Sequence, residues 1–174
     1  MKHLFFTLPL TILSVCGQAQ DNPFKKLKYD KVVIFDMSDR CHPKEWATDF
    51  GRVLKDCAIK DTSLSKAEST KLSELLGNKS SYGAGTASCF DPHLAIVYYQ
   101  GKKIVAHVSV CMDCNRLSLS MPVNMQKIGY GKGKERIYSA DGMRRSFRKY
   151  LNSLLRKYSF SHQSQAGDIW DMER

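Results

Sequence analysis

Two stretches rich in β-forming residues, joined by a short glycine-containing connection, constrain this chain more than any other part of its sequence. They cover residues 94–99 and 103–111, with Gln100-Gly101-Lys102 between them. This pattern predicts two antiparallel strands closed by a tight turn. Both faces of the hairpin are fairly apolar, which favours a central place in a sheet that helices cover on at least one side. We therefore expect an α+β fold, a mostly antiparallel sheet with a central hairpin, packed by two or three helices.

The same hairpin predicts that three cysteines meet at its open end. If Gln100 and Gly101 form a two-residue turn, counting outward along the strands places Cys89 opposite Met112. A turn of three or four residues shifts this pairing by only one or two positions. In each of these registers Cys89 arrives beside the segment Cys111–Cys114.

Three kinds of chemistry suit this cysteine cluster. Cys111 and Cys114 have the spacing of a zinc knuckle, and Cys89 supplies a third thiolate. His93 or His107 could complete a tetrahedral zinc site. The alternatives are a disulfide from Cys89 to Cys111 or Cys114, and a functional redox pair formed by the last two.

The first 19 residues have the features of a secretory signal peptide. Lys2 precedes an uncharged apolar run at residues 4–15, and Gly17-Gln18-Ala19 fits the small-x-small cleavage rule. The run is shorter than the roughly 20 residues that span a bilayer, and we expect no membrane-spanning segment elsewhere. The sequence predicts a periplasmic or secreted protein. The alternative is a lipid anchor on Cys16.

Export changes how the cysteines are interpreted. Removal of Cys16 with the signal peptide leaves an odd number of cysteines, so at least one thiol is free, metal-bound or paired with another chain. The five that remain are Cys41, Cys57, Cys89, Cys111 and Cys114. Cys41 also suits a reactive thiol at a helix N-terminus, as in thioredoxin-like units, although no second cysteine follows at the required spacing.

Segment 46–59 fits either a helix or a loop followed by a strand at residues 53–60. Its apolar residues recur at helical spacing, but Gly51 weakens a helix. The choice decides the chemistry of two cysteines, because one continuous helix would hold Cys41 and Cys57 too far apart for a disulfide.

The remaining pattern predicts one domain at residues 31–160, after a lead-in at 20–30 and before a tail at 161–174. Ser65 followed by Glu68 is a capping box, and Asp141 could cap the last helix. The expected elements are strands at 31–37 and 116–123, helices at 64–76 and from Asp141 to Tyr158, a mobile connection at 79–88 and a basic loop at 125–136.

The formal net charge of +10 is concentrated in the last third of the chain. Residues 125–160 carry ten lysines and arginines against two acidic residues. Outside the cell, such a surface suits anionic lipid or polysaccharide better than nucleic acid, although it is also typical of a solvated helix face. The candidate residues on the last helix are Arg144, Arg145, Arg148, Lys149, Arg156 and Lys157.

Three segments carry a resemblance to a known group. Residues 88–92, 95–99 and 111–114 resemble small exported proteins common in Bacteroidetes-type bacteria, a group without an established function. The resemblance singles out Cys89, Pro92, Cys111 and Cys114, and favours a strand at residues 53–60. Met112 departs from the group, where an aromatic residue is usual.

Catalytic signatures do not stand out in the sequence. We find no Ser/His/Asp order, phosphate-binding glycine loop or paired-carboxylate motif. We therefore expect an exported, non-catalytic domain in which the cysteine cluster, as a disulfide or a zinc site, stabilises the hairpin, and the basic helix contacts an anionic envelope partner. The alternative is a thiol-redox or metal-dependent enzyme that uses Cys111 and Cys114, or Cys41.

Overall fold

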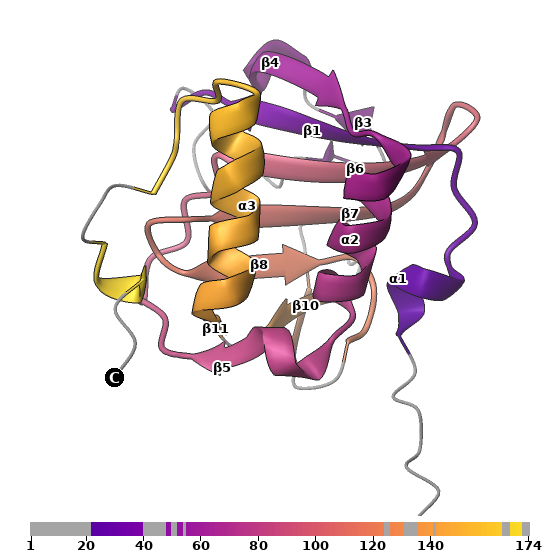
Figure 1. The fold of residues 1–174 in the computed structure, drawn as a ribbon. Coiled ribbons are helices and arrows are strands. Elements are labelled where there is room, and N and C mark those ends of the chain that lie inside the picture. Colours follow the sequence, from indigo (N-terminus) through magenta and orange to yellow (C-terminus); the bar gives the residue numbers. More distant parts are fainter. Residues whose placement is uncertain are drawn as a thin grey trace, which may run out of the picture.

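The computed structural model describes residues 22–39, 48–49, 52–53, 55–123, 126–130, 136–140, 142–164 and 168–171. It contains many strands and two helices of more than two turns (Figure 1). The strands are β1 (Lys31–Met37), β2 (Thr48–Asp49), β3 (Arg52–Val53), β4 (Ala58–Ser63), β5 (Tyr82–Ala84), β6 (Leu94–Gln100), β7 (Lys103–Cys111), β8 (Arg116–Leu119), β9 (Gln126–Tyr130), β10 (Arg136–Ala140) and β11 (Gly142–Met143). The helices are α1 (Pro23–Lys26), α2 (Lys66–Leu76) and α3 (Arg145–Lys157), with single 3₁₀ turns η1 (Lys55–Cys57), η2 (Lys79–Ser81) and η3 (Ile169–Asp171).

Seven strands form one sheet in the order β4-β1-β6-β7-β8-β10-β9, and neighbouring strands in it are antiparallel. The hairpin β6–β7 lies at the third and fourth positions of this sheet. Two small pairs, β2 with β3 and β5 with β11, lie outside it. Helices α2 and α3 cross one face of the sheet (Figure 1). The α+β class and the central hairpin are confirmed.

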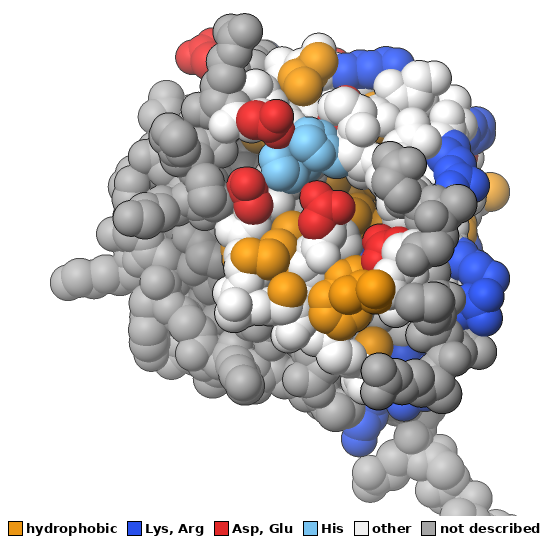
Figure 2. Space-filling view, turned by 90° about the vertical axis from the view of Figure 1, so that its left-hand side faces the viewer, with side chains coloured by type: hydrophobic (Ala, Val, Ile, Leu, Met, Phe, Trp, Pro, Cys, Tyr) orange, Lys and Arg blue, Asp and Glu red, His pale blue; other side chains and the backbone are white. Residues whose placement is uncertain are grey.

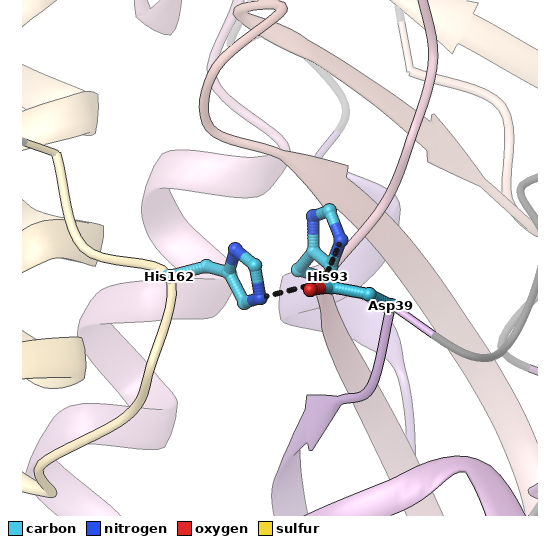
Figure 3. Close-up of side chains that lie close together, drawn as sticks. All are labelled: Asp39, His93 and His162. Atoms are coloured by element: carbon cyan, nitrogen blue, oxygen red, sulfur yellow. Dashed lines mark ion pairs between the residues drawn. The ribbon is translucent and has the colours of Figure 1, made fainter.

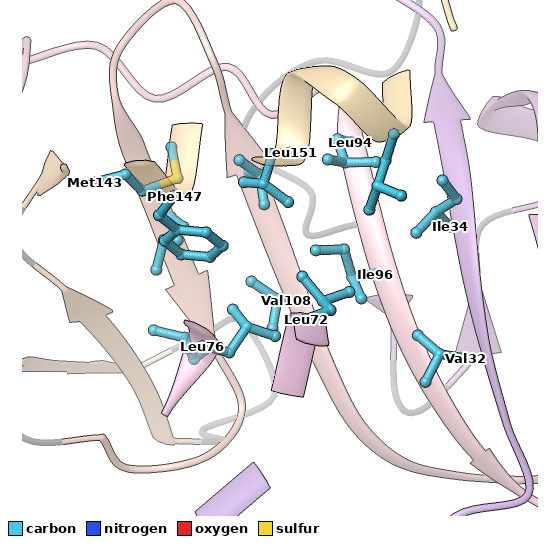
Figure 4. Close-up of a cluster of buried hydrophobic side chains, with 14 of the residues drawn as sticks. Val32, Ile34, Leu72, Leu76, Leu94, Ile96, Val108, Met143, Phe147 and Leu151 are labelled. Carbon is cyan, nitrogen blue, oxygen red and sulfur yellow. The ribbon is translucent and has the colours of Figure 1, made fainter. Parts of the chain in front are cut away.

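The main core lies between this face and the two long helices (Figure 4). Side chains alternate along a strand, so every second residue of β1, β6 and β7 points at the helices. The labelled members of this core are Val32, Ile34, Leu72, Leu76, Leu94, Ile96, Val108, Met143, Phe147 and Leu151. The intervening residues Val33, Phe35, Met37, Ala95 and Val97 form a second buried cluster on the other face. The sheet is thus buried on both sides around β1 and β6, as its apolar strands predict.

The two-residue turn of the hairpin lies one residue later than the position used to count the register. Gln100 pairs with Lys103, so Gly101 and Lys102 form the turn, and Gly101 adopts a positive φ of 58°. The Gly101 N–H also donates to the side chain of Asp30. A bulge at Tyr98 then shifts the pairing again, and Leu94 faces Val110, three positions beyond the predicted partner.

Both predicted helices are present, but they begin differently. In α2 the Ser65 hydroxyl accepts the N–H of Glu68 and the Glu68 carboxylate accepts the N–H of Ser65, so the capping box is confirmed. The last helix begins at Arg145 and not at Asp141, which lies outside the described residues. Gly142 and Met143 instead extend as β11 and pair with β5.

Two segments expected to lack regular structure contain packed elements. The lead-in forms α1, which Asn22 caps and which buries Phe24 completely. The connection at 79–88 contains η2 and β5, and within it Tyr82 is buried with its hydroxyl donating to the carbonyl of Leu76. Both expectations were wrong because a few large apolar side chains tie otherwise polar segments to the core.

The structure decides between the two alternatives for segment 46–59, and three boundaries differ from expectation. Segment 46–59 is not one helix, because its described residues include β2, β3, η1 and the start of β4. The strand favoured at residues 53–60 begins at Ala58. The basic loop at 125–136 contains all of β9 and the start of β10, while β8 ends at Leu119, four residues before the expected end.

Candidate metal-binding site

The side chains of Asp39, His93 and His162 meet where β1 ends and β6 begins (Figure 3). The Nε2 atom of His93 lies 2.9 Å from Oδ1 of Asp39, and Nε2 of His162 lies 3.2 Å from the same oxygen. The three ligand atoms lie within 4.8 Å of one another. We call these three residues the His/Asp cluster.

The end of β1 positions all three members of the His/Asp cluster. The buried carboxylate of Asp36 accepts hydrogen bonds of 2.7 Å from both the N–H and the hydroxyl of Ser161, which holds the residue next to His162 against the strand. One residue further on, the Met37 N–H donates to the carbonyl of His93. Asp39 follows two residues after Met37, so three segments distant in sequence converge around one short stretch.

The histidine rings of the cluster are stacked. Their centroids are 3.6 Å apart and their planes differ by 11°. The side chain of His93 is 11% exposed and that of His162 is 27% exposed, whereas Asp39 is 79% exposed. The cluster is therefore open to solvent on the carboxylate side and supported by protein on the histidine side.

The distances in the cluster suit a shared divalent ion. Two ligand atoms bound to one zinc ion at about 2.0 to 2.2 Å lie about 3.0 to 3.5 Å apart in octahedral or tetrahedral geometry. The two Nε2–Oδ1 distances, 2.9 and 3.2 Å, are those of ion pairs and lie close to this separation. The lone pair of an imidazole nitrogen lies in the ring plane, so coordination requires the two stacked rings to tilt toward each other. His162, in the segment after α3, is the ring with more exposed surface and the freer of the two to do so.

The charge around the cluster also favours a cation. Figure 2 shows acidic side chains around the two histidines, with lysines and arginines nearer the margins of the visible face. Besides Asp39, the carboxylate of Asp91 lies 3.9 Å from Nε2 of His93. In a chain with a net charge of +10, this is a local concentration of negative charge, which raises the local concentration of cations.

Two of the cysteines form a disulfide at the same end of the sheet, beside the turn that follows β7. Cys89 is bonded to Cys114, as one of the two predicted pairings requires. Cys111 keeps a buried free thiol, and Cys57 is also disulfide-bonded. Cys41 lies outside the described residues.

The structure brings the three predicted cysteines together, but not as the predicted zinc site with a histidine as fourth ligand. Two of the three thiols, Cys89 and Cys114, are bonded to each other, and His93 turns toward Asp39. His107 lies in the middle of β7, where burial lowers its pKa to about 4. It is a neutral histidine held on the sheet and not a member of either group.

The basic helix is not a uniform charged surface. Arg148 is completely buried and donates to Asp168, at 2.7 Å, and to the carbonyl of Met112, at 2.6 Å. Arg145 is half-buried. The other four predicted residues are exposed, but Arg144 donates to the carbonyl of Tyr82 and Lys157 pairs with Glu68. The four exposed residues are Arg144, Lys149, Arg156 and Lys157.

Comparison with known proteins adds no assignment, since no protein-family model, curated protein or solved structure matches the chain. The resemblance to exported proteins of Bacteroidetes-type bacteria stays a prediction. Among the described residues, no helix combines the length and apolar character needed to cross a bilayer.

Sequence reasoning missed two members of the His/Asp cluster. Asp39 belongs to a polar group directly after an apolar strand, a position where functional side chains are common, and this signal was present. His162 lies in a segment without periodicity, in the stretch expected to be a tail. Hydrogen bonds from Ser161 to Asp36 and between Ser164 and Asn152 hold this segment in place, and no local pattern predicts them.

Proposed function

We propose that this protein is an exported, disulfide-stabilised domain that binds a divalent transition-metal ion through Asp39, His93 and His162. The observation that carries the proposal is the approach of both Nε2 atoms to one carboxylate oxygen at the separation expected of ligands on a shared ion. Two imidazoles and one carboxylate suit zinc, iron(II), cobalt(II) or nickel(II) better than calcium or magnesium, which prefer oxygen ligands.

Two features support the remaining parts of the proposal. The apolar N-terminal stretch with its small-x-small site fits a signal peptide, and the disulfide between Cys89 and Cys114 fits an oxidising compartment. Three protein ligands leave coordination positions for water, and the exposed side of Asp39 gives them access. The domain would act by holding the ion, with no group assigned to a catalytic step.

Zinc titration of the oxidised, mature protein tests this proposal. We expect one equivalent of zinc to bind at neutral pH, and to bind less tightly in acid because protonated imidazoles have no lone pair to donate. His93→Ala and His162→Ala should each weaken binding by at least about 10-fold, since each removes one of three ligands. Isothermal titration calorimetry measures both the stoichiometry and the affinity.

A matched control separates coordination from general electrostatic attraction. Asp39→Asn removes a ligand oxygen charge, whereas Asp113→Asn removes a charge from an exposed carboxylate outside the cluster. Equal loss of affinity in both variants would mean that zinc is attracted by surface charge alone. Zinc binding that is unchanged in His162→Ala would refute the site.

A further inference from the structure

The buried thiol of Cys111 has an amide donor aimed at its sulfur. The N–H of Cys114 donates to the Cys111 sulfur at 3.2 Å. A neutral thiol is a weak acceptor, so this donor stabilises a thiolate more than a thiol. Burial raises the pKa of this thiol while the backbone groups of Asp91 and Cys114 oppose the rise, so in the oxidised chain it stays protonated.

The turn that carries Cys111 has the shape of a metal-binding knuckle. Cys111 and Cys114 are three residues apart, and the N–H of the second donates to the sulfur of the first. The next residue, Asn115, adopts a positive φ of 50°, which reverses the chain. Its side chain donates to the carbonyls of Gly85 and Met143, so the turn is held in this shape by contacts outside itself.

The third sulfur is already beside the turn. The disulfide brings Cys89 to Cys114, with 5.9 Å between their Cα atoms. Arg116 holds this segment independently of the disulfide, because its guanidinium donates to the carbonyl of Ser88 and lies 5.6 Å from the ring centre of Phe90. Breaking the disulfide would therefore leave Cys89 near the other two sulfurs.

We propose that, once the disulfide is reduced, the thiolates of Cys89, Cys111 and Cys114 bind a thiophilic divalent ion of the zinc class. A dithiol reductant supplies two electrons and two protons to the Cys89–Cys114 bond and itself becomes a disulfide. Cys89, Cys111 and Cys114 then all carry thiols. Zinc displaces their protons to solvent and leaves its fourth coordination position to water.

This second site is distinct from the His/Asp cluster in ligands and in oxidation state. His93 faces Asp39 and is not needed as a fourth ligand. The disulfide and the thiolate site exclude each other, because Cys89 and Cys114 supply the sulfur atoms of both. Of these two sites, the oxidised chain therefore offers the His/Asp cluster, while the reduced chain offers both.

The test compares zinc stoichiometry before and after reduction of the full mature chain. The protein is reduced with a dithiol, freed of reductant without oxygen, and titrated with zinc and then with cobalt(II) as a spectroscopic probe. We expect the reduced chain to bind one equivalent more than the oxidised chain. Cobalt(II) should produce an intense sulfur-to-metal charge-transfer band only after reduction.

Two variants distinguish this site from the His/Asp cluster. Cys111→Ser keeps the disulfide in the oxidised chain, and after reduction it should lack the additional equivalent. Cys89→Ser changes an exposed position and should lose it too, whereas His162→Ala should keep it. A reduced wild type that binds no more zinc than the oxidised form would overturn the proposal, as would a reduced chain whose circular dichroism shows unfolding with zinc present.

Discussion

The turn Met112–Asn115 and the His/Asp cluster lie at the same end of the sheet, yet they are built in opposite ways. The carbonyls of the turn accept hydrogen bonds from Arg148, from the Trp170 indole and from the N–H of Ala87. The cluster, in contrast, presents a carboxylate that is 79% exposed. One region uses its polar groups to hold the chain together, and the other leaves them accessible to a ligand.

A single short segment joins these two regions. Cys89 begins it at the disulfide, and His93 ends it in the His/Asp cluster. Between them, the backbone of Asp91 lowers the pKa of the Cys111 thiol, while the Asp91 carboxylate lies 3.9 Å from Nε2 of His93. The comparison shows that a rigid turn can position an exposed site, because the disulfide at Cys89 anchors the short segment that carries His93.

Of the variants considered, loss of Arg148 should lower the free energy of unfolding most, because its guanidinium donates to the Met112 carbonyl of the turn. Arg148→Ala leaves the Asp168 carboxylate and the Met112 carbonyl without this donor and opens a cavity in the core. We expect the free energy of unfolding to fall by about 3 to 5 kcal/mol. Urea denaturation followed by circular dichroism measures this change.

Lys149→Ala is the matched control for Arg148. It removes a positive charge from the next position of the same helix, where the side chain is exposed. The expected change is within about 0.5 kcal/mol. If both variants lost the same stability, net charge and not the buried contact would explain the result.

Acid should lower the free energy of unfolding through His107, which lies in the middle of β7 and belongs to neither site. Burial lowers its folded-state pKa from 6.5 to about 4, so the unfolded chain binds the proton more readily. Its contribution to stability is complete above about pH 6.5 and is lost as the pH falls toward 4, by up to about 3 kcal/mol. Urea denaturation across this pH range measures the loss.

The variant His107→Gln tests the assignment of this pH dependence. Glutamine does not titrate, so the free energy of unfolding should fall less steeply between pH 6.5 and pH 4 than in the wild type. A slope as steep as that of the wild type would show that other groups cause it.

Loss of His162 should have the smallest effect on stability, and this sharpens the contrast with Arg148. The ion pair with Asp39 involves a largely exposed carboxylate. Pairs of this kind contribute about 0 to 1 kcal/mol, so His162→Gln should lower the free energy of unfolding by less than about 1 kcal/mol in the absence of metal. A loss as large as that of Arg148→Ala would mean that the cluster is structural.

Local signals predicted the fold where they were self-contained. The hairpin, the strand at 31–37 and the capped helix α2 each follow from apolar periodicity and from the residues at their ends. The register failed because the turn lies at Gly101 and Lys102, one residue later than counted, and because the bulge beside Tyr98 has no local signature. The start of α3 failed because the pairing of Gly142 and Met143 with β5 depends on a segment far away in sequence.

The sites were predicted where the hairpin alone determined them. Antiparallel pairing was enough to place Cys89 beside Cys114. The charge pattern alone wrongly placed Arg148 on the surface, because no residue near it in the sequence indicates that it pairs with Asp168 in the core. The His/Asp cluster was missed because its three members come from three segments that only the folded sheet brings together.

The position of β1 in the sheet also governs the order in which the chain can fold. β1 is the first strand, but its inner neighbour is β6, far along the chain. Folds dominated by such distant pairings have high contact order and form slowly. A nascent chain that ends before Gln100 exposes the apolar residues of β1 on both faces, so it is an aggregation-prone species until β6 has been synthesised.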